Sequence, residues 1–354
     1  MDADHTEHPP VRHPPKPRPG DTVAVLSPSS GLAGLLPRPH ELGLRRLREE
    51  FGLVVREYPT TRTPGASAAA RAADLHAAFA DPEVKAVIAT IGGDDQITVI
   101  PHLDAELLRA HPKPFFGYSD NTNLLLFLRS LGMVAYHGAS VMTEFGRPGA
   151  LHPLTAASAR AALFDTGPFE LTPAESFRDL DRPWDDPATF EAEPETEPAG
   201  GWTWRNADRV VEGRAWGGNL EILTWMLAAA RTGPRDTDRD GEVLFVETSE
   251  ELPPAEEVFR MLRNLGERGL LARFAAVLVG RAKARSLDHL PDAETRARYR
   301  ADQRAAVERV LEAYAPTAPA VFDVDLGHTD PQLVIPVGGL VRVDGPARRI
   351  HVTY

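Results

Sequence analysis

A serine stands on a predicted turn between a short apolar strand and an amphipathic helix, in the segment FGYSDN at 116–121. Gly117 lies two positions before Ser119, where a sharp strand-to-helix turn requires a residue without a Cβ. A serine on such a turn has its backbone N–H at a helix N-terminus, which suits a nucleophile whose transition state carries an oxyanion. The segment lacks the last glycine of the Gly-x-Ser-x-Gly motif, and a simple helix cap at Ser119 or Asp120 is the alternative.

Glu247 and His328 share the context of Ser119, because each is expected at or just after the end of an apolar strand and beside a turn. Glu247 closes the run EVLFVE, and His328 follows the run FDVDLG. A serine nucleophile needs a base to take its proton, and the base needs a carboxylate to orient it. The three residues are therefore candidates for a Ser-Glu-His triad. Seen alone, His328 has a simpler explanation as a turn histidine, and Glu247 as a solvated acid.

Gly92 and Gly93 end another apolar strand and begin the run GGDD. Their backbone N–H groups are candidate donors to an oxyanion, with the N–H of Asp120 as a further donor. The same glycines are equally suited to cradle a phosphate. The run resembles the Gly-Gly-Asp-Gly loop of some nucleotide kinases, although the Gly and Thr that complete that loop are missing. The alternative hypothesis is therefore a non-catalytic or kinase-like nucleotide-binding protein that uses this loop.

The composition of the chain excludes several classes of function. The chain has 354 residues, more than one core usually holds, and 42% of them are hydrophobic, so two packed domains are expected. The formal net charge of −12 argues against a nucleic-acid partner. No apolar run approaches the length of a membrane-spanning helix, so no membrane partner is expected. The absence of cysteine excludes disulfides and thiol nucleophiles, and no metal-binding motif indicates a catalytic metal.

The first half of the chain alternates predicted strands and helices. Strands are expected at 21–28, 53–55, 84–91 and 133–136 and just before Ser119, and helices at 39–51, at 67–80, up to 107 and after Ser119. Such alternation is typical of a parallel α/β sheet. Ligands of these sheets bind beyond the carboxyl ends of the strands. Four candidate positions fall at such ends: Ser27, Gly92–Gly93, Ser119 and His137.

The second half begins with a segment of different composition. Residues 176–208 are rich in Pro, Asp, Glu and Trp and predict a linker that carries a long loop between two domains. The glycine-rich run at 213–220 is interpreted as a turn that opens a helix extending to Leu227. Strands are then expected at 242–247, 275–280, 321–325, 340–343 and 350–352, and helices at 254–266 and 296–313.

Four parts are predicted along the chain. A disordered arm at 1–19 is followed by an N-terminal α/β domain at 20–165 that carries the nucleophile. A linker with the Trp-bearing loop at 166–209 leads to a C-terminal domain at 210–354 that carries Glu247 and His328. The arm contains six prolines in its first twenty residues and no apolar core segment, so it does not resemble a secretory signal, and the cytoplasm is the expected location.

Seven segments of the chain occur in the same order as in one known family. They are GDTVAVLSPSSG, IGGDD, FFGYSDNTNLL, YHGASVM, GRAWGGNLEIL, EVLFVETSEE and VDLGHTDPQLVIPVGG, which together span roughly residues 20 to 345. In these segments the chain resembles the LD-carboxypeptidases, a family of serine peptidases that includes the microcin-C immunity peptidases. The family's triad of Ser, Glu and His, in that chain order, falls on Ser119, Glu247 and His328.

The resemblance also implies a fold and an assembly. It implies an N-terminal flavodoxin-like domain with a parallel sheet, a C-terminal α+β domain with a small β-barrel-like sheet, and an active site between them. It further implies a homodimer and no metal or organic cofactor. One departure is that the catalytic Glu of murein-cleaving members is generally followed by Asp, whereas Thr248 follows Glu247 here.

The Trp-bearing segment resembles the microcin-immunity branch, in which a tryptophan of this loop stacks on the adenine of a peptidyl-adenylate. Trp184, Trp202 and Trp204 are the candidates here, with packing at the domain interface as the alternative. Tyr118 and Asn219 are further candidate substrate-binding residues.

These features together predict a serine peptidase or amidase that hydrolyses an amide near a free carboxylate through an acyl-enzyme. Its expected substrate is either a murein L,D-peptide that releases a terminal D-alanine or a microcin-C-like peptidyl or aminoacyl nucleotide.

Overall fold

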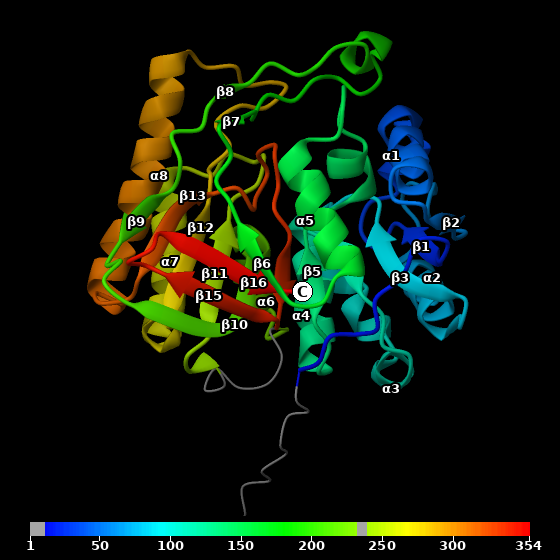
Figure 1. The fold of residues 1–354 in the computed structure, drawn as a ribbon, viewed down its shortest axis with the longest axis horizontal. Helices are drawn as coiled ribbons and strands as arrows, with labels where there is room; N and C mark the ends of the chain where they lie inside the picture. The colour runs from blue at the N-terminus through cyan, green and yellow to red at the C-terminus, as the bar shows by residue number, and fades with distance from the viewer. Residues whose placement is uncertain (1–10, 232–238) are drawn as a thin grey trace, which may run out of the picture.

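One large sheet of parallel and antiparallel strands forms the centre of the protein (Figure 1). The structure is a computed structural model and describes residues 11–231 and 239–354. The strands follow the order β2-β1-β3-β4-β5-β14-β10-β11-β12-β13-β9 across the sheet. In chain order their bounds are β1 Thr22–Leu26, β2 Val54–Glu57, β3 Val84–Ala89, β4 Phe115–Gly117, β5 Ala135–His137, β9 Thr203–Arg205, β10 Val210–Asn219, β11 Val243–Glu247, β12 Ala276–Gly280, β13 Ala320–Val324 and β14 Ile335–Val337. The predicted α/β class is confirmed.

The first five strands are all parallel and follow the order 2-1-3-4-5. This is the flavodoxin-like order that the family resemblance implies. β3 is buried at every position except Lys85, as expected for a strand covered on both faces. The helices of this half are α1 Pro37–Glu49, α2 Ala68–Ala80, α3 Ala105–Ala110, α4 Thr122–Ser130 and α5 Pro153–Phe164. The carboxyl ends of the parallel strands therefore lie at one edge of the sheet.

In the second half, β10, β11, β12 and β13 are parallel, and β9 pairs antiparallel to β13 at the edge. A small antiparallel group branches from β10 and contains β15 (Leu340–Asp344), β16 (Arg349–Thr353) and β6 (Pro168–Leu171). The helices are α6 Leu220–Ala228, α7 Ala255–Glu267 and α8 Ala293–Tyr314. Over the described residues, none of the helices combines the length and the apolar character needed to cross a membrane.

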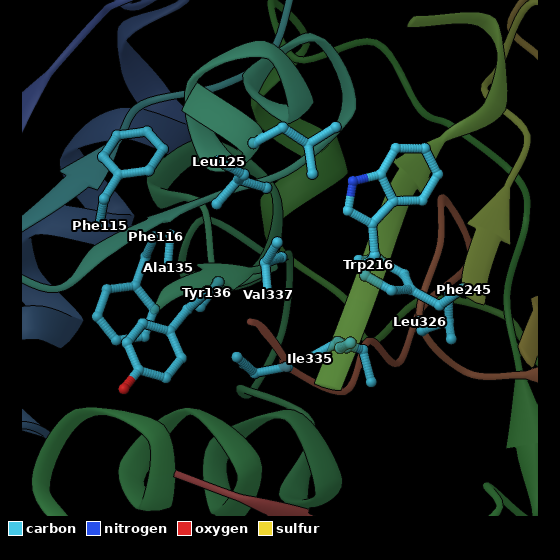
Figure 2. Packing of buried hydrophobic residues seen from close by; sticks show 14 of the residues in the cluster. Phe115, Phe116, Leu125, Ala135, Tyr136, Trp216, Phe245, Leu326, Ile335 and Val337 are labelled. Atoms are coloured by element: carbon cyan, nitrogen blue, oxygen red, sulfur yellow. The ribbon is translucent and has the colours of Figure 1, made fainter. Parts of the chain in front are cut away.

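The short strand β14, which the sequence analysis did not predict, joins the two halves. It pairs antiparallel with β5 and parallel with β10. Figure 2 shows its side chains Ile335 and Val337 between Tyr136 of the first half and Trp216 of the second. All four residues are buried, so the halves share one packed core. This core fixes the spacing between the strand ends that carry Ser119 and those that carry Glu247 and His328.

The glycine-rich run at 213–220 was predicted as a turn, and this prediction is wrong, because residues 213–219 are the last part of strand β10. Its glycines are needed for close packing. A Cβ at Gly217 would lie 1.8 Å from the backbone oxygen of Phe245, and one at Gly218 would lie 2.5 Å from the side chain of Thr122. The predicted helix does follow, because α6 begins at Leu220.

The predicted disordered arm is also wrong for the part that the structure describes. Arg12 forms a bridge with Met133, with backbone hydrogen bonds to Gly132 and Val134 of 2.9 Å each. Lys16 donates to the Tyr136 hydroxyl at 2.6 Å. A proline-rich composition therefore did not prevent ordered packing here, because these few polar contacts hold the chain on the first half. Residues 1–10 of the predicted arm lie outside the described residues.

The predicted linker at 166–209 contains β6, the two-stranded pair β7 (Ser176–Phe177) and β8 (Glu197–Pro198), a short 3₁₀ helix and β9. Figure 1 shows the middle of this segment crossing the top of the molecule from the second half toward α1. At one end the buried Asp179 pairs with Arg285 at 2.6 Å, and at the other Arg38 donates to the Asp185 backbone oxygen at 3.0 Å. The segment is thus held by polar contacts to both halves.

Candidate active site

Ser119 lies on the turn between β4 and α4 with φ of 61°, in the left-handed region that non-glycine residues rarely adopt. Gly117 lacks a Cβ for the reason the sequence suggests: a Cβ there would lie 3.0 Å from Asn121 Cγ and 3.1 Å from Ala89 Cβ. A strained serine between a strand and a helix is a feature of nucleophile turns and costs on the order of 1–3 kcal/mol. The surrounding structure must therefore hold this backbone in place.

The side chain of Asp120 stabilises this strained turn. The residue is buried, with 1% of its surface exposed. It accepts hydrogen bonds from the Ser29 hydroxyl, from the Gln96 N–H at 2.8 Å and from Asn123 Nδ2 at 3.0 Å. Burial raises the pKa of Asp120, while the hydrogen bonds from Ser29 and Gln96 act in the opposite direction. The carboxylate thus fixes the turn, and only the backbone N–H of Asp120 is a candidate for contact with substrate.

Glu247 and His328 form a buried pair in the second half. Glu247 ends β11, and His328 lies in the loop after β13, with its Nδ1 2.5 Å from Glu247 Oε2. Gly280 and Gly327 make room for the carboxylate, since a Cβ at these positions would lie 2.6 Å and 2.8 Å from Glu247 Cβ. Burial disfavours the charged ring, but the carboxylates of Glu247 and Glu250 outweigh it and raise the pKa of His328 to about 9.

A cavity of about 420 Å³ brings the two halves of the site together. Ser119 and His328 both line it, whereas Glu247 lies behind the histidine. Tyr118 lines it as well, with its ring centroid 4.9 Å from that of His328. Tyr118 is therefore placed where the sequence analysis expected a substrate-binding residue.

Gly92 and Gly93 also line this cavity. A Cβ at Gly92 would lie 2.9 Å from Ser119 Cβ and 3.4 Å from the backbone nitrogen of Asp120, so glycine keeps this approach open. Gly93 lies against Ser29, whose Oγ would be 2.4 Å from an added Cβ. Of the three predicted oxyanion-hole residues, Gly92 thus lies directly against Ser119 and Gly93 is the next residue on the cavity wall, whereas Asp120 follows Ser119 in the chain and does not itself line the cavity.

Of the three tryptophans predicted to bind substrate, only Trp184 lines the cavity. Trp202 is held elsewhere, because its indole N–H donates to Asp325 Oδ2 at 2.9 Å. Trp204 belongs to the edge strand β9, and its ring lies 5.5 Å from the guanidinium of Arg348. Placing Trp202 and Trp204 among the substrate contacts does not agree with these positions, which are set by packing.

Asn219 is likewise absent from the residues that line the cavity. It is 1% exposed, and its Oδ1 accepts from the Ile222 N–H at 3.0 Å, so it caps the N-terminus of α6. Its backbone N–H donates to Thr122 Oγ1 at 3.1 Å, which ties α6 to the helix that follows Ser119. In this structure Asn219 supports the nucleophile turn from behind.

The sequence analysis missed the charged residues that line the cavity: Glu144, Arg147, Arg178, Asp181, Arg182, Glu250, Lys283 and Asp330. Arg147 and Arg178 share Asp330, with nitrogen–oxygen distances of 2.8 Å and 3.8 Å. Lys283 pairs with Asp181 at 2.6 Å. Burial raises the pKa of Glu144 to about 7. A polar residue soon after an apolar strand is a signal that the sequence does show. Lys283 after β12 and Glu250 after β11 are the two of these residues with that signal.

Family models match both parts of the chain. The LD-carboxypeptidase N-terminal domain matches residues 23–138, and the LD-carboxypeptidase C-terminal domain matches residues 212–343. The first match contains Ser119, and the second contains Glu247 and His328.

Relatives of known name cover most of the chain. The probable murein peptide carboxypeptidase of Bacillus subtilis is 32% identical over 327 residues, covering 90% of this chain and 87% of its own length. The microcin C7 self-immunity protein MccF of Escherichia coli is 25% identical over 294 residues, covering 80% of this chain and 78% of its own. The solved structure of MccF in complex with aspartyl sulfamoyl adenosine has a TM-score of 0.82 at 23% identity, covering 96% of this chain and 99% of that one. This structural likeness supports the same fold. The two family matches and the relative that is 32% identical show that the chain belongs to the LD-carboxypeptidase family of serine peptidases.

Proposed function

We propose that the protein hydrolyses an amide near a free carboxylate and that Ser119, Glu247 and His328 are its catalytic triad. The observation that carries this proposal is that His328 lines the same cavity as the strained Ser119 and is paired behind that wall with Glu247, whose Oε2 lies 2.5 Å from His328 Nδ1. Glu247 orients the ring through Nδ1, which leaves Nε2 as the nitrogen that takes the proton of the serine. The alternative of a kinase-like or non-catalytic nucleotide-binding protein does not agree with the family membership.

The reaction follows from these positions. His328 Nε2 takes the proton of Ser119 Oγ as the oxygen attacks the carbonyl carbon, and then gives it to the leaving amine. The acyl-enzyme that remains is hydrolysed by a water that His328 deprotonates in turn. Glu247 stabilises the imidazolium in both steps. The backbone N–H groups of Gly92 or Gly93 and of Asp120 stabilise the oxyanion, which is worth about 2.7–4 kcal/mol for one donor.

The cationic side chains in the cavity favour a substrate with a negatively charged group. Arg147, Arg178 and Lys283 line the same cavity as Ser119. Arg147 donates through Nε to Asp330 and through Nη1 to Pro148, Ala150 and Glu193, so its Nη2 is the nitrogen left for a further oxygen acceptor. Arg178 and Lys283 also keep donors beside their partners Asp330 and Asp181. A terminal carboxylate, or the linker of an aminoacyl nucleotide, is an acceptor of this kind. The cavity thus supports the two substrates that the sequence predicts.

Two different observations favour the two substrates. The relative that is 32% identical is named a probable murein peptide carboxypeptidase, which favours a murein L,D-peptide and release of D-alanine. Trp184 lines the cavity, and a structure of MccF holds aspartyl sulfamoyl adenosine, which favours a nucleotide whose base stacks on that ring. In the second case the enzyme protects against a peptidyl-nucleotide toxin, and in the first it recycles cell-wall peptides.

A paired hydrolysis assay tests this proposal. The protein is incubated with a murein tetrapeptide and, separately, with an aminoacyl-sulfamoyl adenylate, each with Ser119→Ala as the control. We expect cleavage of at least one substrate and none by Ser119→Ala. Full activity of Ser119→Ala would overturn the triad. The identity of the cleaved substrate decides between recycling and protection.

The homodimer and the cytoplasmic location are also part of the proposal. The homodimer rests on the family resemblance, and the cytoplasm is the default location that the sequence analysis expects. Light scattering of the purified protein at several concentrations measures the first, and cell fractionation measures the second. A monomer at all concentrations would overturn the homodimer, and protein found outside the cytoplasm would overturn the location. Neither result would affect the proposed triad or its reaction.

A further inference from the structure

Both ring nitrogens of His328 lie beside carboxylates. Nδ1 is 2.5 Å from Glu247 Oε2, and Nε2 is 3.2 Å from Glu250 Oε2. A neutral imidazole carries a single N–H and has one acceptor nitrogen. One carboxylate is hydrogen-bonded at Nδ1 and the other lies within ion-pair distance of Nε2, so this geometry favours a second N–H and with it the imidazolium form of the ring. In this form Nε2 has no lone pair for the proton of Ser119.

We propose that Glu250 is a positioning residue, which covers Nε2 of His328 in the substrate-free enzyme and moves aside when a substrate enters the cavity. This inference rests on the proposed triad and adds a regulation of that triad. Glu250, His328 and Ser119 line the same cavity, so a substrate that fills it competes with Glu250 for the space beside Nε2. The base becomes free only when the reacting group is present.

The structure allows Glu250 to move without a change in the backbone around it. The side chain of Glu250 is 55% exposed, whereas that of His328 is 8% exposed. The preceding residue is fixed, because the Ser249 N–H and hydroxyl both donate to Glu221 Oε1, at 2.9 Å and 2.7 Å. A rotation of one exposed side chain, and not a loop movement, is therefore sufficient to uncover Nε2.

Other groups that face His328 do not replace Glu250 in this role. Glu247 is buried on the far nitrogen, and burial lowers the pKa of His137 to about 4, so that ring stays neutral. Burial raises the pKa of Tyr118, so its hydroxyl stays protonated. Lys283 opposes protonation of His328 but is paired with Asp181. Glu250 is thus the neighbour on the Nε2 side that favours the charged ring.

The consequence is a difference between the free and the substrate-bound enzyme. The pH profile of kcat/KM reports the pKa of His328 in the free enzyme, where Glu250 raises it, and the profile of kcat reports the bound enzyme. The acid limb of kcat/KM is therefore expected at a higher pH than that of kcat. Removal of the Glu250 charge brings the two limbs together.

The test measures the second-order rate at which a fluorophosphonate modifies the serine, as a function of pH. This reaction needs His328 as a base but no knowledge of the natural substrate. The wild type is compared with Glu250→Gln and Glu250→Ala, with Glu251→Gln as a matched control one residue along the chain. We expect both Glu250 variants to shift the acid limb down by about one pH unit or more, which is about a tenfold faster rate at pH 7. Glu251→Gln keeps the wild-type limb.

An unchanged limb in both Glu250 variants would overturn the role of Glu250 while the triad stands. A slower rate with an unchanged limb would do the same and would assign Glu250 to packing. If the wild type is not modified at any pH, the triad itself fails, and the proposal for Glu250 fails with it. The two failures are thus distinguished in one experiment.

Discussion

The position of Ser119 is fixed by the backbone of its turn, whereas the protonation state of His328 is set by the charges of two neighbouring carboxylates. The turn at Ser119 has a positive φ and is supported by the hydrogen bonds of Asp120 and by a neutral network in which Gln96 Nε2 donates to Asn121 Oδ1 at 2.8 Å. His328 lies between two carboxylates, and its protonation state depends on both. A change at the first region is expected to alter geometry and stability together. A change at the second is expected to alter chemistry and pH dependence with little change in shape.

The largest effect is expected from Glu247→Gln, which keeps the shape of the side chain and removes the charge that orients His328. By the behaviour of such triads, kcat/KM falls by roughly 10⁴-fold because the imidazolium is no longer stabilised. Steady-state hydrolysis of the cleaved substrate measures this. Glu212→Gln, an exposed acid on β10, is the control and should keep wild-type activity. A loss of less than tenfold would show that Glu247 is not the orienting acid.

The next effect concerns Trp184, the tryptophan on the cavity wall. If the substrate carries a base, Trp184→Ala should lower kcat/KM for the aminoacyl-sulfamoyl adenylate about tenfold to a hundredfold, because stacking on an aromatic ring is worth about 1–3 kcal/mol per base. Hydrolysis of a murein tetrapeptide should change less. Trp204→Phe serves as the control on edge strand β9. Equal losses with both variants would assign Trp184 to packing.

Asp120→Asn tests the backbone-held region. An amide in place of the carboxylate puts an NH2 group either at the Oδ2 position, opposite the Ser29 hydroxyl and the Gln96 N–H, or at the Oδ1 position, opposite Asn123 Nδ2. The protein should therefore lose about 1–3 kcal/mol of unfolding free energy. Urea denaturation measures the stability, and activity should fall in parallel as the turn relaxes. Asp94→Asn, an exposed residue in the GGDD run, should change neither quantity. Full stability in Asp120→Asn would mean that the turn is held by other contacts.

The smallest effect is the pH dependence of stability that comes from His328. Its folded pKa of about 9 lies above the unfolded value of 6.5, so protonation favours the folded state. This stabilisation is complete below pH 6.5 and is lost as the pH rises through 9. Compared with His328→Gln, the wild type should therefore lose about 1–2 kcal/mol more of its unfolding free energy between pH 6 and pH 9.5. Parallel curves for the two proteins would contradict the raised pKa.

The three residues of the proposed triad could be selected from the sequence because each lies at or just after the end of an apolar strand, and the carboxyl ends of parallel strands meet at one edge of a sheet. Gly117 carried similar information, since its neighbours Asn121 and Ala89 leave no room for a Cβ. The parallel sheet of the first half also followed from the alternation of strands and helices, whereas its flavodoxin-like strand order was expected only from the family resemblance. These are local patterns with a single structural solution.

Other parts were not predictable because they depend on contacts between distant segments. Gly217 and Gly218 were assigned to a turn, but their lack of Cβ atoms serves the packing of β10 against β11 and α4. Nothing in the sequence distinguishes Trp184 from Trp202, since only the fold shows that Asp325 holds the second. The place of Glu250 beside His328 is likewise set by two loops that lie 78 residues apart, as the numbering shows.

The most direct test of the central claim is to locate the covalent adduct that a fluorophosphonate forms with the protein. We predict one adduct, found by peptide mass spectrometry on Ser119, absent in Ser119→Ala and formed far more slowly in His328→Ala. An adduct on another residue, or hydrolysis that persists in Ser119→Ala, would contradict the claim that Ser119 is the nucleophile activated by His328.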